Sequence, residues 1–84
     1  MGYEVLIIRS AEKELDNLPD TICDRLSKRI ISLKDNPRPI GTKKLSGRDE
    51  YRLRIGAYRI LYTVDDAEKY VTIVAIGHRR NVYR

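Results

Sequence analysis

The fold is decided by residues 51–62, which read Y-R-L-R-I-G-A-Y-R-I-L-Y. On either side of Gly56 and Ala57, apolar or aromatic side chains alternate with other residues. A Gly-X pair between two alternating runs predicts a two-residue β-hairpin with a type II′ turn, because glycine takes the positive φ of the first turn position without strain. Such a turn fixes the register, in which Ile55 lies opposite Tyr58 and Arg54 lies opposite Arg59.

The predicted register gives the hairpin two different faces. One face is apolar or aromatic, and the other carries Arg52, Arg54 and Arg59. Like charges directly opposite each other destabilise a strand pair by a few tenths to about 1 kcal/mol. Folding therefore gives no reason for placing Arg54 across from Arg59, whereas binding of a polyanion does.

The first half of the chain predicts one strand followed by two helices. Residues 3–9 read Y-E-V-L-I-I-R, and the continuous apolar run within them predicts a strand buried on both faces, in the interior of a sheet. Ser10 is the expected N-cap of the first helix. Pro19 ends that helix, and the second helix runs to about Lys34, with its apolar residues on one stripe.

The second half predicts three more strands. Residues 38–50 read as a polar loop, the hairpin follows, and residues 69–76 form the last strand of an antiparallel meander. The order β-α-α-β-β-β predicts a single α+β domain over residues 1–84. We expect a small, mainly antiparallel four-stranded sheet, with a two-helix hairpin on one face and the arginine side uncovered.

The composition of the chain limits where the protein can act and which disulfide or metal sites it can form. The chain contains no apolar run of 18 residues, its apolar run near the start is too short for a signal peptide, and Cys23 is its only cysteine. We expect a cytoplasmic protein without membrane contact, disulfide or cofactor. The acidic residues Asp65, Asp66 and Glu68 read as a turn rather than as a metal site.

Positive charge is concentrated in the second half of the chain. Residues 1–42 hold seven Lys and Arg against seven Asp and Glu, whereas residues 43–84 hold ten against five, a difference of +5 that equals the net charge. This asymmetry favours a nucleic acid as partner over an anionic membrane. Lys43, Lys44 and Arg48 are candidate RNA contacts, although such a run is also typical of a solvated loop.

The candidate catalytic residues suit chemistry at a phosphate. Guanidinium groups bind phosphate with two parallel hydrogen bonds and can stabilise a phosphorane, but they are poor proton acceptors. Histidine titrates near neutrality, so His78 is a candidate acid or base for attack by a ribose 2′-hydroxyl, or else an ordinary surface or core residue. Tyr83 could stack on a base or fold back onto the sheet. Arg79 and Arg80 add charge beside them.

Several segments together resemble one family. The hairpin 51–62, the turn V-D-D at 64–66, the strand V-T-I-V-A-I at 71–76 and the ending G-H-R-R-N-V-Y-R at 77–84 resemble the RelE branch of the RelE/ParE toxin superfamily. The resemblance covers nearly the whole chain. It implies a ribosome-dependent endoribonuclease that cleaves messenger RNA without a metal and leaves a 2′,3′-cyclic phosphate. It also implies an antitoxin partner, which we expect to contact the basic face and Ile31.

The resemblance also implies roles for individual residues. Arg52 and Arg54 stand where the family has basic residues, often lysines, that act as base or stabilise charge. By the same similarity Arg59 contacts the scissile phosphate, Arg79 stabilises the transition state or assists the leaving oxygen, and Tyr83 stacks on the nucleotide. Arginine is a poorer base than lysine, so either His78 takes the proton or positioning and electrostatics supply most of the rate.

Two other functions stay open on the same sequence. A ParE-type inhibitor of DNA gyrase has this fold and needs no catalytic residues, but its members usually lack paired hairpin arginines and the ending seen at 77–84. A non-enzymatic RNA-binding module would show salt-dependent binding without new RNA ends.

Overall fold

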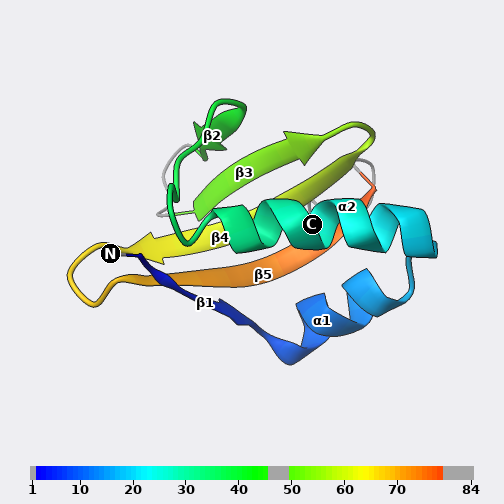
Figure 1. The fold of residues 1–84 in the computed structure, drawn as a ribbon, viewed down its shortest axis with the longest axis horizontal. Coiled ribbons are helices and arrows are strands. Elements are labelled where there is room, and N and C mark those ends of the chain that lie inside the picture. The colour runs from blue at the N-terminus through cyan, green and yellow to red at the C-terminus, as the bar shows by residue number, and fades with distance from the viewer. Residues whose placement is uncertain (1, 46–49, 79–84) are drawn as a thin grey trace.

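The computed structural model describes residues 2–45 and 50–78, and it contains two helices packed on one side of a mixed sheet (Figure 1). The sheet has five strands within these residues, in the order β1-β5-β4-β3-β2. β1 runs parallel to β5, and all other neighbours are antiparallel. The elements are β1 (Glu4–Ile7), α1 (Arg9–Asp16), α2 (Asp20–Ser32), β2 (Thr42–Lys44), β3 (Glu50–Ile55), β4 (Tyr58–Asp65) and β5 (Tyr70–His78). This confirms the α+β class and the helical hairpin on one face.

The predicted hairpin register is confirmed at every position. β3 pairs with β4 so that Ile55 lies opposite Tyr58, Arg54 opposite Arg59, and Tyr51 opposite Tyr62. Gly56 has a φ of +61°, whereas Ala57 has a negative φ, as a type II′ turn requires.

The core lies between the helices and the sheet. It is built from one stripe of each helix and from alternate residues of the strands, as the helical and strand periods predict. The most deeply buried of its members are Ala11, Leu26, Leu33, Leu53, Ile60, Tyr62, Val71 and Ile73. In the described part of the chain neither helix has the length and apolar character needed to span a membrane.

The expected interior position of the first strand was wrong. β1 is an edge strand, and Leu6 and Ile8 remain 50% and 40% exposed. The alternate residues Tyr3, Val5 and Ile7 pack against the core. The continuous apolar run therefore reflects one buried side and one uncovered side, because no helix covers the second face of the sheet.

The sheet has five strands instead of the expected four because a short strand lies in the presumed loop. β2 pairs with β3 through its backbone, with Lys43 opposite Arg52 and Lys44 opposite Tyr51. Both lysines are exposed, so no hydrophobic alternation marked the strand. The helix start was also misplaced, since Ser10 lies inside α1, and Ile8 at the N-cap makes no side-chain capping hydrogen bond.

A β-bulge changes the direction of side chains near the end of β5. Tyr62 lies opposite Ile73, but its neighbour Leu61 lies opposite Ala75, so Val74 is the extra residue. β1 has already ended there, and the Ile76 N–H instead donates to Glu14 Oε1 of α1 at 2.9 Å. The last residues of β5 are thus held by β4 on one edge and by α1 on the other.

A buried tyrosine joins the loop before β2 to the sheet. Tyr62 is fully buried, and its hydroxyl donates to the Pro37 carbonyl at 2.6 Å. The same oxygen lies 3.2 Å from Thr42 Oγ1 at the start of β2. Burial is the main cause that raises the pKa of Tyr62, while the Thr42 hydrogen bond opposes it.

We expect Tyr62→Phe to lower the free energy of unfolding by about 1–3 kcal/mol, because the buried Pro37 carbonyl loses its donor. Urea denaturation followed by far-UV circular dichroism measures the change. Tyr70→Phe is the matched control, since Tyr70 is exposed at the start of β5, and it should stay within about 0.5 kcal/mol of the wild type. Equal stability of the two variants would contradict this role of the hydroxyl.

Tyr62→Phe also tests the raised pKa of the Tyr62 hydroxyl. Unfolded tyrosine ionises near pH 10, whereas the native state keeps Tyr62 protonated to a higher pH. The unfolded state therefore binds fewer protons above that pH, and the free energy of unfolding falls as pH rises past about 10. Tyr62→Phe should show a shallower alkaline loss than both the wild type and Tyr70→Phe.

Candidate nucleic-acid interface

Four cationic side chains share the face of the sheet that no helix covers. Residues opposite each other in a sheet point to the same side, and two neighbouring rows cross this face. One row runs Lys43, Arg52, Leu61, Ala75, and the next runs Arg54, Arg59, Gly77. We call Lys43, Arg52, Arg54 and Arg59 the arginine face. Its cations come from β2, β3 and β4, whereas β5 contributes only small residues to the same rows.

The arginine face combines exposed and half-buried cations. Arg54 and Lys43 are exposed, while Arg52 and Arg59 are partly covered. Leu61 points to this side, away from the helices, and is still only 5% exposed. Its cross-strand neighbour Arg52 has the aliphatic stem needed to cover it while the guanidinium stays available to an anion.

Two positive charges of the arginine face, those of Arg54 and Arg59, repel each other. Arg54 lies directly opposite Arg59, as the sequence predicted. Within residues 2–45 and 50–78, no carboxylate lies within ion-pair distance of the Arg54 guanidinium. The Nε atoms of Arg52 and Arg59 are buried and have no hydrogen-bond acceptor in that part of the chain, although both residues make other interactions. An anion placed here would reduce the repulsion.

A hollow of about 460 Å³ lies beside these residues. Gly41, Thr42 and Lys43 line it from the β2 side, and Arg52 and Arg54 line it from β3. Gly41 has a φ of +97°, a conformation that favours glycine. The hollow is therefore bordered by three cations and by a stretch of backbone with little side-chain bulk.

His78 does not join the arginines. It lies opposite Tyr58, and the two rings meet edge to face with centroids 5.7 Å apart. Tyr58 packs against the core on the helix side, so His78 lies on that side as well. The bulge at Val74 is the cause, because strict alternation from Ile73 would have placed residue 78 on the arginine face. His78 therefore lies on the other side of the sheet from Arg54 and Arg59.

The other predicted site residues divide into three groups. Lys43 belongs to the arginine face, whereas Lys44 lies opposite Tyr51 and points to the helix side. The remaining candidates lie outside the described residues; they are Arg48, Arg79, Arg80 and Tyr83.

Sequence reasoning did not predict a polar network that joins the segment before β2 to the β4–β5 turn. Arg38 binds Asp66 with both terminal nitrogens, at 2.8 and 3.2 Å, and its Nε donates to the Tyr51 hydroxyl at 3.0 Å. Tyr3 also donates to Asp66, at 2.7 Å. The hydrogen bond from Arg38 is the main cause that holds the pKa of Asp66 below its usual value, and the same bond raises the pKa of Arg38.

The network is a positioning device more than a source of stability. It lies at the surface, where an ion pair contributes about 0–1 kcal/mol. It ties the segment before β2 to the β4–β5 turn, which helps to place β2 and Lys43. Asp65 of the same turn is used locally, since it accepts the Glu68 N–H at 3.0 Å. No local sequence pattern indicates this network, because Arg38 and Asp66 are 28 residues apart.

The geometry supports phosphate binding and charge stabilisation. Three guanidinium groups on two adjacent strands can donate to the oxygens of one phosphate or of two neighbouring ones. They stay charged at any working pH, so they can stabilise a pentavalent intermediate, but none of them readily accepts a proton.

Comparisons with known proteins agree with this arrangement. Residues 5–83 match the family model described as the ParE toxin of the type II toxin-antitoxin system, parDE. A protein of Methanocaldococcus jannaschii named toxin RelE1 is 34% identical over 100% of this chain and 98% of its own length. The mRNA interferase toxin RelE of Escherichia coli is 30% identical over 94% of this chain and 85% of its own length.

A solved structure extends the agreement to the fold. A chain in the toxin-antitoxin complex RelBE2 of Mycobacterium tuberculosis superimposes with a TM-score of 0.83 at 28% identity, covering 94% of this chain and 100% of that one. The fold and the basic face thus define a small toxin of the type II toxin-antitoxin class. Within that class, the chain belongs to the RelE/ParE superfamily, in its RelE branch.

The repulsion between Arg54 and Arg59 leads to a prediction on stability. We expect Arg54→Thr to raise the free energy of unfolding by a few tenths to about 1 kcal/mol, because it removes a like-charge pair and introduces a β-branched residue. Urea denaturation measures the change. Arg54→Lys keeps the charge and should give no comparable gain. A loss of stability in Arg54→Thr would show that the arginine supports the fold.

Proposed function

We propose that this protein is a ribosome-dependent endoribonuclease that cleaves messenger RNA, and that it acts in the cytoplasm as the toxin of a toxin-antitoxin pair. The observation that carries the proposal is the convergence of Arg52, Arg54 and Arg59 on the uncovered face of the sheet. The name of the Escherichia coli relative, an mRNA interferase, points to the same activity.

The proposed reaction is an internal transesterification. The ribose 2′-oxygen attacks the adjacent phosphorus and forms a new P–O bond, while the bond to the 5′-oxygen of the next nucleotide breaks. The products are a 2′,3′-cyclic phosphate and a 5′-hydroxyl, and no metal is required. Arg52 and Arg59 would donate to the non-bridging oxygens, where negative charge increases as the phosphorane forms.

The position of His78 favours one of the two proton routes that the sequence left open. His78 lies on the helix side, whereas the scissile phosphate would lie on the arginine face. We therefore assign most of the rate to positioning of the 2′-hydroxyl for in-line attack and to stabilisation of charge. Water or a group of the ribosome would then take the proton of the 2′-hydroxyl, and water would supply the proton that the leaving 5′-oxygen gains. Arg79 and Tyr83 keep the roles that the family resemblance gives them.

The proposed partner is a cognate antitoxin that covers the arginine face. The Mycobacterium tuberculosis structure described above is a toxin-antitoxin complex by its title. A protein that offers carboxylates to Arg52, Arg54 and Arg59 would both neutralise these charges and exclude RNA.

The central test of this proposal is the loss of cleavage in arginine variants. We expect Arg59→Ala and Arg52→Ala each to slow cleavage of a ribosome-bound message at least about 100-fold, the effect of removing one donor to a developing oxyanion. Primer extension maps the new RNA ends, and mass spectrometry should find a 3′ end lighter by one water than a linear phosphate. Lys13→Ala, on the exposed side of α1, is the matched charge control.

Two results would contradict the proposal. Wild-type cleavage by Arg52→Ala and Arg59→Ala would remove the arginine face from the reaction. DNA damage signalling without new RNA ends on expression would instead indicate a gyrase inhibitor, the ParE-type alternative that the sequence left open.

A separate prediction concerns His78. Because its side chain lies across the sheet from Arg59, His78→Gln should cleave within a few-fold of the wild-type rate and keep the wild-type dependence on pH. Single-turnover cleavage on purified ribosomes measures both. A large loss of rate, together with loss of an acid limb near neutrality, would restore the base role of His78.

A further inference from the structure

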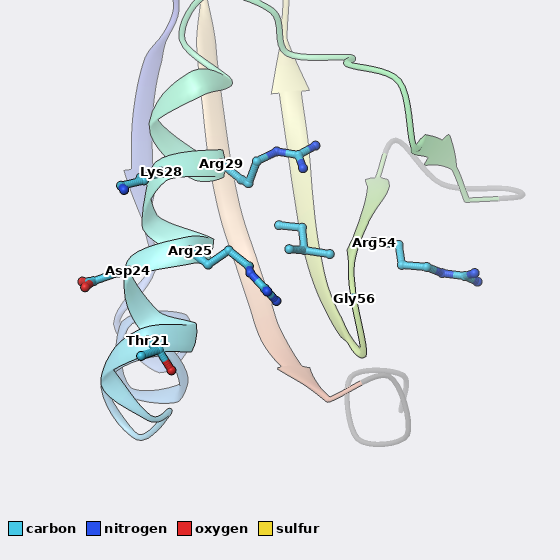
Figure 2. Close-up of a pocket in the computed structure, with 8 residues that line it drawn as sticks. Thr21, Asp24, Arg25, Lys28, Arg29, Arg54 and Gly56 are labelled. Atoms are coloured by element: carbon cyan, nitrogen blue, oxygen red, sulfur yellow. The ribbon is translucent and has the colours of Figure 1, made fainter.

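A second basic surface lies on the opposite side of the β3–β4 hairpin. A groove of about 680 Å³ runs between α2 and the hairpin turn, and its cationic lining comes from Arg25, Lys28, Arg29 and Arg54. Figure 2 shows Arg25 and Arg29 extending from α2 toward the hairpin, whereas Asp24 and Lys28 point to the other side of the helix. Two guanidinium groups thus enter the groove, and the single acidic lining residue points away from it. We call this groove, lined by these four cations, the α2 groove.

The charges of the α2 groove are not balanced within the described chain. Across residues 2–45 and 50–78, no carboxylate forms an ion pair with Arg25, Lys28 or Arg29. Arg25 and Arg29 are four residues apart, or about 6 Å along the helix, where like charges repel each other. As with Arg54 and Arg59 on the sheet, local stability gives no reason for this pair.

The hairpin turn leaves space for one of these groups. Nη1 of Arg25 lies 3.6 Å from the place that a Cβ on Gly56 would occupy. The guanidinium of Arg25 therefore reaches the turn itself, and the glycine leaves the backbone there open. Thr21, one turn earlier on α2, adds a hydroxyl to the same groove.

The α2 groove is continuous with the arginine face at a single residue. Arg54 lines the α2 groove, and it also lines the hollow formed with Lys43 and Arg52. Its side chain points away from α2 in Figure 2, toward the arginine face. A band of positive charge therefore passes around the end of the hairpin from one face of the sheet to the other.

We propose that the α2 groove binds the sugar-phosphate backbone of a structured RNA, distinct from the message held on the arginine face. The inference rests on the proposed function, because a ribosome-dependent enzyme must hold ribosomal RNA and the message at the same time. Binding on two sides of the hairpin would place the hairpin between the two RNAs and orient the arginine face toward the message.

The lining favours RNA over an acidic protein segment. Ile55, the apolar residue of the groove, is only 6% exposed, so no hydrophobic anchor is available to a protein helix. The cores of protein interfaces are enriched in aromatic residues and depleted in lysine, whereas nucleic-acid interfaces are polar and strongly positive. Forked guanidinium groups and a hydroxyl are the usual donors to phosphate oxygens.

The test compares two double variants of the full chain in binding to purified 70S ribosomes. Arg25→Gln/Arg29→Gln removes the two charges that enter the groove, and Arg9→Gln/Lys13→Gln removes two exposed charges from α1. We expect the groove variant to bind about ten-fold or more weakly, and to lower the slope of log K against log salt by about 1.5–2, as the loss of two phosphate contacts predicts. The α1 variant should change neither quantity as much.

The outcomes separate this inference from the cleavage proposal. Ribosome affinity is measured without cleavage, so a failure of the proposed reaction leaves the result interpretable. Equal affinity and equal salt slope for the two double variants would overturn the inference.

A second experiment compares binding of each double variant to an RNA duplex and to polyglutamate of the same total charge. If the groove substitutions weaken polyglutamate binding but not duplex binding, the site is for an acidic protein and the inference is wrong. Circular dichroism checks that both variants fold.

Discussion

The structure depends on the register that the Gly56–Ala57 turn imposes on β3 and β4. Side chains alternate across a strand, so a slip of one residue would turn Leu53, Ile60 and Tyr62 outward and bury the arginines under the helices. Glycine at +61° in φ makes this turn without strain, and the same residue keeps the turn open beside Arg25. One turn therefore sets the core, the arginine face and one wall of the α2 groove.

Repulsion between like charges is the common property of both basic surfaces. Arg54 opposes Arg59 across two strands, and Arg25 precedes Arg29 by one helical turn. Neither pair favours the fold, so each is best understood by the anion that it attracts. Arginine suits this purpose because it remains charged and offers forked donors, but it is a poor base. Catalysis by such a set must come from charge stabilisation and positioning.

The sequence predicted what short-range periodicity determines. The hairpin register, both helices and the convergence of Arg52, Arg54 and Arg59 follow from alternation and from one turn. Features that depend on long-range pairing could not be predicted in the same way. β2 forms only because the edge of β3 is available, and the Arg38–Asp66 pair has no local signal. The face of His78 depends on one extra residue, Val74, which reverses the alternation after Ile73. Arg79 and Tyr83 lie outside the described residues, so their part in the site still rests on resemblance.

The most direct measurement is a cryo-electron microscopy structure of the protein on a ribosome whose message carries a 2′-O-methyl group at the cleavage position, which blocks the attack. We expect non-bridging oxygens of the adjacent phosphate to lie within about 2.7–3.2 Å of guanidinium nitrogens of Arg52 or Arg59. A message that passes along the helix side of the sheet, or a phosphate beyond the reach of all three hairpin arginines, would contradict it.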